Sequence, residues 1–197
     1  AITGNGPVRV FTAGDETVAR AVVIATDPRA VGSLVDGFTA PAMNSVTTWY
    51  HRASQSPHEL SGGIGVLVVD GRGPGRVGPL ANSVVISNAA RSYAPPDTAL
   101  VSSSALGVHD SPADDVAALE HASTLHRVST RGWELVGKFV IEDALPATPA
   151  PLNVRKEVRL GERRYVAGDH RDTPSIQGAL VSGRRTAQAV IADLAGA

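Results

Sequence analysis

Near its C-terminal end the sequence passes from a short β-like run into a long helix, with only a tight loop between them. Arg164–Ala167 form the run, which stops at Gly168 and Asp169, and Thr173–Pro174 are expected to cap the helix. Apolar residues then recur at helical spacing, at Ile176, Ala179, Leu180, Ala187, Val190, Ile191 and Leu194. This segment predicts a strand, a loop and an amphipathic helix in direct succession.

The first turns of this predicted helix carry unusually small side chains. Gly178, Ala179, Ser182 and Gly183 fall in one span. A glycine inside a helix costs roughly 1 kcal/mol relative to alanine, so two of them need a reason. Close approach of a ligand or of a neighbouring backbone is the usual one.

The same segment has a coherent chemical use. An acid at a strand end, here Asp169, can accept hydrogen bonds from sugar-type hydroxyls, and a helix start without bulky side chains can bring free amides to an electron-rich carbonyl. A reduced flavin carries such charge at its N1/O2 edge. The residues alone leave a second interpretation open, in which Asp169 only ends a strand and the glycines only let the helix pack.

Composition narrows the class of protein. The 197 residues include no cysteine, so neither disulfides nor cysteine-bound zinc are available. A 43% hydrophobic content with a net charge of -1 fits a globular protein and not a binder of nucleic acid, which would usually be basic. The longest apolar runs, such as Val22–Ala25 and Val66–Val69, fall far short of the roughly 18 residues of a membrane span. A cytoplasmic protein is expected.

The beginning of the chain is unusual, because it opens at Ala1 and its single methionine is Met43. No charged-then-apolar targeting pattern follows Ala1. Two origins stay open, a processed product and an excised piece of a longer protein.

The pattern changes twice along the chain. We first expect two strands joined by a tight turn at Gly14–Asp15. The first strand contains Val8 and Val10, and the second runs over Val18–Ala25, is covered on both faces and ends at Thr26–Pro28. Short antiparallel strands and one helix follow, at Val46–His51, Ile64–Val69, Val84–Ser87, Leu100–Leu106, the helix from Ser111 and Pro112 to about Val128, and the strand Trp133–Ile141. We therefore expect one domain from residues 1–40 and 155–197, and another from residues 41–154.

Some apparent motifs are set aside. Residues 73–78 match G-x-G-x-x-G, but Pro79 and the following β-like residues predict a hairpin loop instead of the helix that a dinucleotide site needs. Neither G-x-S-x-G nor H-E-x-x-H occurs. His121 and His126 lie five apart, so they are expected on different faces of a helix, exposed to solvent and not sharing a metal.

Residues 165–170 (YVAGDH) and 175–185 (SIQGALVSGRR) resemble the C-terminal FAD signature of the flavin-containing amine oxidase superfamily, which includes phytoene desaturases. Residues 21–28 (AVVIATDP) resemble the strand and turn before the substrate domain of that family, and residues 92–96 (SYAPP) and 144–146 (ALP) are similar to segments of its other members. The resemblance implies an α+β fold: part of an α/β FAD domain (1–40 and 155–197) with an antiparallel-sheet substrate domain (41–154).

The resemblance also implies a cofactor site. Asp169 would hold the ribityl chain of FAD, and the helix start would face the pyrimidine end of the flavin ring; the implied cofactor-binding residues are Gly168, Asp169, Ser175, Ile176, Gln177, Gly178 and Ala179. The N-terminal dinucleotide motif of the family is not in this sequence, so the FAD site is incomplete and the expected partner is a missing N-terminal half.

The function that follows is the C-terminal part of an FAD-dependent oxidoreductase, which oxidises a small organic substrate by hydride transfer to flavin. The chain by itself is expected to be inactive. No catalytic residue is identified, because the only lysines, Lys138 and Lys156, lie in no matching motif. The substrate (amine, polyene or tetrapyrrole) and the oligomeric state stay open. The alternative is a non-catalytic domain that binds a partner or ligand and keeps the fold without flavin.

Overall fold

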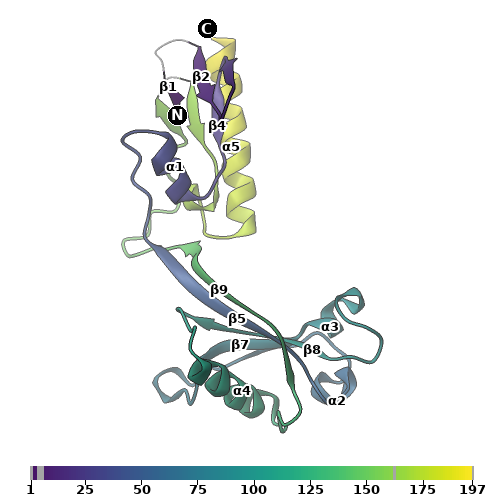
Figure 1. The fold of residues 1–197 in the computed structure, drawn as a ribbon. Coiled ribbons are helices and arrows are strands. Elements are labelled where there is room, and N and C mark those ends of the chain that lie inside the picture. The colour runs from purple at the N-terminus through teal and green to yellow at the C-terminus, as the bar shows by residue number, and fades with distance from the viewer. Residues whose placement is uncertain (1, 4–6, 162, 197) are drawn as a thin grey trace. The chain divides into compact units, whose positions relative to one another are not determined.

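The computed structural model describes residues 2–3, 7–161 and 163–196, so Ala1 lies outside the described residues (Figure 1). The chain divides into two compact units. The outer unit consists of Ala1–Met43 with Leu145–Ala197, and the inserted unit is Asn44–Ala144. Helices and antiparallel sheets are mixed, which confirms the α+β fold class.

The outer unit contains two small sheets. In the first, β1 (Ile2–Thr3), β2 (Val8–Phe11) and β3 (Glu16–Ala19) are antiparallel in that order. The second has the order β10-β11-β4, formed by Arg159–Gly161, Arg164–Val166 and Val22–Ile24. In it, β11 pairs in parallel with β4, with Tyr165 opposite Val23.

The predicted single strand Val18–Ala25 is wrong. The chain leaves one sheet after Ala19 and enters the other at Val22. The expected cover on both faces is also not found: Ile24 is buried, but Val23 is 46% exposed. An apolar run in the sequence does not show where a strand ends or which of its faces is covered.

Two helices complete the outer unit. Helix α1 (Pro28–Leu34) begins at Asp27, whose carboxylate accepts hydrogen bonds from the amides of Arg29 and Ala30. Val31 of this helix and Val35, its C-cap, pack with Ile24 and Val166 in one core. Helix α5 runs from Ile176 to Ala195 and is preceded by the 3-10 turn η3 (Asp169–Arg171).

The cap of α5 differs from the prediction. Ser175, and not Thr173–Pro174, is the N-cap, because Ser175 has extended backbone and its Oγ accepts the amide of Gly178 at 3.0 Å. A hydroxyl that satisfies a free amide fixes the helix start more directly than a proline two residues earlier.

The inserted unit is built on a five-stranded sheet of order β6-β7-β8-β5-β9. The strands in that order are Leu67–Val69, Leu80–Val85, Leu100–Leu106, Met43–Arg52 and Glu134–Pro146. Neighbours β6 and β7, β7 and β8, and β8 and β5 pair antiparallel. The strand predicted at Leu100–Leu106 has the observed bounds of β8, and Val46–His51 lies within β5. The prediction of a strand at Val84–Ser87 is mostly wrong, because β7 begins at Leu80 and Ile86 and Ser87 already belong to helix α3 (Ile86–Ala89).

Helix α4 (Pro112–His126) lies against one face of this sheet (Figure 1). The predicted start is confirmed: Ser111 caps the helix and forms a reciprocal capping box with Asp114. The core contains Trp49, Val101, Ala118 and Ala122. Shorter elements are α2 (Pro57–Ser61), η1 (Gly73–Gly75) and η2 (Arg91–Tyr93).

The glycine-rich stretch and the helix histidines have structural roles. As predicted, residues 73–78 connect the antiparallel strands β6 and β7. The predicted exposure of His121 and His126 is wrong. The His121 ring is buried, with Nε2 2.9 Å from the Asp70 carboxylate and Nδ1 accepting the amide of Leu80, and His126 Nε2 lies 2.8 Å from Ser83 Oγ.

The reason is geometric: His121 stands three residues after Ala118, on the face that α4 buries. A Cβ at Gly78 would lie 2.5 Å from the His121 side chain, so this glycine is required by packing.

No helix among the described residues is long and apolar enough to cross a membrane.

Candidate cofactor site

The carboxyl ends of β4 and β11 lie at the same edge of their sheet, because the two strands are parallel. Asp27 follows β4, and Gly168 and Asp169 follow β11. In open α/β sheets this is the edge at which ligands bind. Topology therefore brings the candidate acid Asp169 to a ligand-binding edge.

Helix α5 fixes this edge through small polar side chains. The buried Ser182 hydroxyl accepts the amide of Gly168 at 3.1 Å, and Thr186 donates to the carbonyl of Val166 at 3.1 Å. Arg185 donates to the carbonyls of Arg171 and Lys156 and pairs with Asp172 at 3.2 Å. The strand end and the following loop are thereby held against the helix.

Three groups at this edge have free hydrogen-bonding capacity. The Asp169 carboxylate is partly exposed, and among the described residues it contacts His170 Nδ1 at 4.0 Å. The amides of Gly178 and Ala179 are taken by the side chain and the carbonyl of Ser175. The amides that α5 leaves for a ligand are thus those of Ile176 and Gln177.

The two helix glycines have different environments. A Cβ at Gly178 would lie 1.8 Å from the carbonyl oxygen of Thr173, whereas at Gly183 it would have no neighbour within 4 Å. Close packing of the loop before α5 therefore explains Gly178 without a ligand. Gly183 is explained by nothing in the described part of the chain.

Gly168 is also constrained. Its φ is 156°, and a Cβ there would lie 2.5 Å from the His170 ring. Glycine is the residue that accepts this backbone without a clash. The strand end at Asp169 thus depends on Gly168 and on the buried ring of His170.

An aromatic and cationic cluster next to this edge was missed by sequence reasoning. Phe38 meets His170 edge to face, with ring centroids 6.0 Å apart, and the Arg171 guanidinium lies 4.6 Å from the Phe38 centroid. Burial, helped by the nearby Arg171 charge, lowers the pKa of His170 to about 4, so the ring is neutral at pH 7. The distance in sequence between Phe38 and the other two residues gives no signal for this contact.

The predicted apolar stripe of α5 is mostly exposed. Ile176 is 77%, Leu180 70% and Ile191 67% accessible, while the buried positions are Gly178, Ser182, Thr186 and Ala189. The helix therefore packs on β11 with its small face, and its large apolar side chains point elsewhere. Gly183 and Ala187 lie between these apolar residues at helical spacing. We call this set of five residues the α5 stripe: Ile176, Leu180, Gly183, Ala187 and Ile191.

Lys138 has a structural role. Lys138 pairs with Asp115 at 2.7 Å and lies over the Trp49 ring at 5.7 Å. It is therefore part of the contact between β9, β5 and α4.

The sequence-predicted site residues Gly168, Asp169 and Ser175–Ala179 all lie on η3, its flanking residues and the start of α5.

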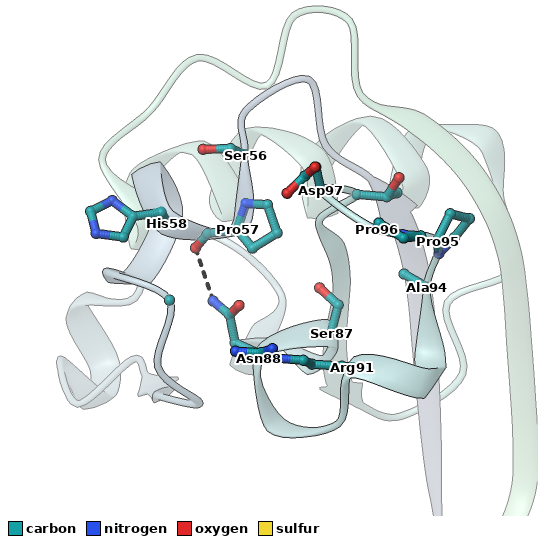
Figure 2. Close-up of a pocket in the computed structure, with 12 residues that line it drawn as sticks. Ser56, Pro57, His58, Ser87, Asn88, Arg91, Ala94, Pro95, Pro96 and Asp97 are labelled. Carbon is teal, nitrogen blue, oxygen red and sulfur yellow. Dashed lines mark hydrogen bonds between the residues drawn. The ribbon is translucent and has the colours of Figure 1, made fainter.

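A pocket of about 630 Å³ opens in the inserted unit, and none of the predicted site residues lines it (Figure 2). Asn88 donates to the Pro57 carbonyl and to Ser61, and Ser87 accepts the amide of Leu100. These polar groups hold the loops of the pocket wall together, so they are not aimed at a ligand. A second pocket of about 520 Å³ shares Ser56, Asp97 and Thr98 with it.

Solved structures with a similar fold include two oxidoreductases and a halogenase in complex with FAD. A protein of Exiguobacterium sp. 255-15 described as a protoporphyrinogen oxidase has a TM-score of 0.68 at 17% identity, covering 96% of this chain and 45% of that chain. An oxidoreductase of Methanosarcina mazei has a TM-score of 0.62 at 11% identity, with 94% and 47% covered. The halogenase PltM in complex with phloroglucinol and FAD has a TM-score of 0.57 at 8% identity, with 98% and 41% covered.

At these identities the likeness is one of fold. This chain spans less than half the length of each of these structures. No curated protein sequence matches it.

The family model described as flavin containing amine oxidoreductase matches residues 2–191. The chain belongs to this family, which confirms the resemblance seen in residues 165–185. The similarity to phytoene desaturases in particular stays a prediction.

Proposed function

We propose that this chain is the C-terminal part of an FAD-dependent oxidoreductase, and that the edge after β11 binds the flavin end of FAD. The observation that carries the proposal is that two kinds of free group flank one loop. The Asp169 carboxylate accepts no hydrogen bond from the described residues and has only His170 at 4.0 Å, and the amides of Ile176 and Gln177 are free at the start of α5. A ribityl chain offers hydroxyl donors, and a flavin pyrimidine offers carbonyl acceptors. The residues present fit both.

Each residue has a task in this proposal. Asp169 accepts hydrogen bonds from ribityl hydroxyls, and the Ile176 and Gln177 amides, with the positive end of a 20-residue helix, stabilise negative charge at the pyrimidine edge. Gly168, Ser175, Gly178 and Ala179 shape the loop and the helix start. Bound FAD supplies a hydride acceptor for a small organic substrate.

The dinucleotide-binding half is the proposed partner. The α5 stripe presents three large apolar side chains to solvent around Gly183, where the structure leaves space for a close backbone approach. An apolar surface of this kind on one helix face is typical of packing against another element. The residues 1–40 with 155–197 then act as part of an FAD domain, and residues 41–154 as a substrate domain. Cytoplasmic location stays a prediction.

The test is made on the longer protein that carries this chain. Cofactor released by denaturation is identified by mass, and reduction of the bound flavin is followed by absorbance. We expect stoichiometric FAD. A folded longer protein without flavin would contradict the proposal and support the alternative, a non-catalytic binding domain.

A further inference from the structure

The pocket drawn in Figure 2 is lined by two exposed side chains of opposite charge, Arg91 on η2 and Asp97 in the loop that follows. In that view Arg91 lies with Asn88 on one side of the pocket, and Asp97 lies on the other. Among the described residues, neither charged group forms an ion pair or a side-chain hydrogen bond. Both are therefore free to bind a ligand.

The backbone that carries these two charges is held in place. The Asn88 side chain donates to the Pro57 carbonyl at 2.9 Å, which ties α3 to α2 on one side of the pocket. The amide of Thr98 donates to the Pro95 carbonyl at 3.1 Å and closes the turn that contains Asp97. A pocket whose walls are fixed before binding loses little conformational entropy when a ligand enters.

The turn itself gives no reason for a carboxylate at Asp97. Its φ is 60°, in the left-handed region that glycine adopts more easily than any other residue. Aspartate usually serves in a turn by accepting a hydrogen bond from a nearby amide, and among the described residues the Asp97 carboxylate accepts none. The carboxylate is thus available to the pocket that it lines.

The size of the pocket indicates a ligand larger than a single ion. Its volume of about 630 Å³ lies within the roughly 300 to 1,000 Å³ of ligand pockets, and it equals about 20 water molecules at roughly 30 Å³ each. Besides the two charges, the wall contains the rings of Pro57, Pro95 and Pro96 and the methyl group of Ala94. These surfaces can contact a carbon skeleton.

The two charges restrict the class of ligand. A purely anionic ligand, such as phosphate, would pair with Arg91 but would share the pocket with the Asp97 carboxylate, and a purely cationic one would share it with Arg91. A ligand with both an ammonium and a carboxylate can pair with both residues. His58, the third titratable residue of the lining, suits such a ligand, because a neutral imidazole both donates and accepts hydrogen bonds.

We propose that this pocket binds a short zwitterionic peptide, whose terminal carboxylate pairs with Arg91 and whose terminal ammonium pairs with Asp97. The proline rings contact the side chains of the peptide, and the Thr98 hydroxyl can bind its amide group. The inference goes beyond the proposed function, because no flavin takes part and none of the candidate cofactor residues lines the pocket.

Binding is tested by calorimetric titration of the dipeptide alanyl-phenylalanine into the longer protein at pH 7, where the terminal amine of the dipeptide is mostly protonated. We expect saturable binding at one site. N-acetyl-alanyl-phenylalanine lacks the ammonium and alanyl-phenylalanine amide lacks the carboxylate, so each should bind at least about fivefold more weakly. Equal affinity for the three peptides, or no saturable binding at millimolar concentration, would overturn the proposal.

Matched variants assign the two charges. Arg91→Gln should weaken binding of the dipeptide and of its acetylated form at least about fivefold, and it should not weaken binding of the amide form. Asp97→Asn keeps a residue that tolerates the left-handed backbone, and it should weaken binding of the dipeptide and the amide form but not of the acetylated form. Arg76→Gln and Asp15→Asn, at exposed positions outside the lining, are the controls.

Circular dichroism and flavin content are measured on the same samples. Folded variants in which the controls weaken binding as much as Arg91→Gln and Asp97→Asn would refute this site. Loss of FAD with the peptide pattern intact contradicts only the proposed function, whereas FAD present without the pattern contradicts only this inference.

Discussion

At the residue scale, Asp169 is the side chain with the most specific proposed role. In the longer protein, Asp169→Ala should lower FAD retention at least about tenfold, because hydrogen bonds to a charged acceptor contribute roughly 1.5 to 3 kcal/mol. Flavin content per folded protein is the measurement. Asp15→Ala, in an exposed turn of the same unit, is the control.

Asp193, near the C-terminal end of α5, would not be a suitable control. Its carboxylate accepts hydrogen bonds from Tyr165 and Arg159 and so holds β10 and β11 to the helix. Equal flavin in the Asp169→Ala and Asp15→Ala variants would leave Asp169 with the role of ending a strand.

The two helix glycines give opposite expectations for stability. Gly178→Ala should lower the free energy of unfolding by about 2 kcal/mol or more, because the new Cβ would lie 1.8 Å from the Thr173 carbonyl oxygen. Gly183→Ala should raise it by up to about 1 kcal/mol in the isolated chain, because alanine favours helix and meets no neighbour. Urea unfolding of the two variants measures both. A similar effect at the two positions would contradict this account of the helix start.

Stability should depend on pH through His170. Its folded pKa, about 4, lies below the ordinary value of 6.5, so protonation favours the unfolded chain. The stabilisation is complete above about pH 6.5 and is lost as the pH falls toward 4, in total by about 3 kcal/mol. His170→Leu should therefore reduce the loss of stability between pH 7.5 and pH 5. An unchanged loss of stability in this variant would refute the burial of a neutral His170 ring. Part of the pH dependence of stability should remain, because burial also lowers the pKa values of His51, His121 and His126.

At the element scale, a substitution in the α5 stripe should affect stability differently in the isolated chain and in the longer protein. Leu180→Lys should change the unfolding free energy of the chain by less than about 0.5 kcal/mol, because Leu180 is 70% exposed. In the longer protein the same change should cost about 2 kcal/mol or more, because a charge would enter a packed contact. Gln188→Lys, on another exposed part of α5, should be neutral in both. A loss confined to the isolated chain would refute docking at the stripe.

Elements with local signals were predicted well from the sequence. Ser111 and Pro112 mark the start of α4 through hydrogen bonds within one turn, and β8 was predicted with its observed bounds. The break in Val18–Ala25 was missed, because two sheets compete for this run and no turn residue marks the change.

For the candidate site, the sequence indicated the order strand, Gly-Asp and helix, which the structure contains. It could not show that Gly178 is required by Thr173, or that Phe38 contacts His170, because both depend on packing across loops. The burial of His121 was missed for the same reason. Helical spacing identifies residues that share a face, and it does not say which of several faces becomes buried.

At the scale of the whole molecule, the chain by itself should not retain FAD through purification. In the proposed site it contacts only the flavin end of FAD, and the sequence analysis finds no N-terminal dinucleotide motif in its 197 residues. Gel filtration of the chain with added FAD, followed by absorbance of the protein peak, measures this. Stoichiometric flavin in that peak would contradict the proposed division of the site.

The inserted unit enters and leaves the outer unit at one place. β5 begins at Met43 and β9 ends at Pro146, the two strands are neighbours in the sheet, and the amide of Ala147 donates to the carbonyl of Ala42 at 2.8 Å. A continuous segment whose two ends lie side by side can be replaced as a unit, and the backbone of the remaining chain need not change. Chimeras that carry the corresponding segment of a relative between Ala42 and Ala147 would leave the proposed flavin residues in place, and they would test whether the proposed substrate domain determines substrate preference.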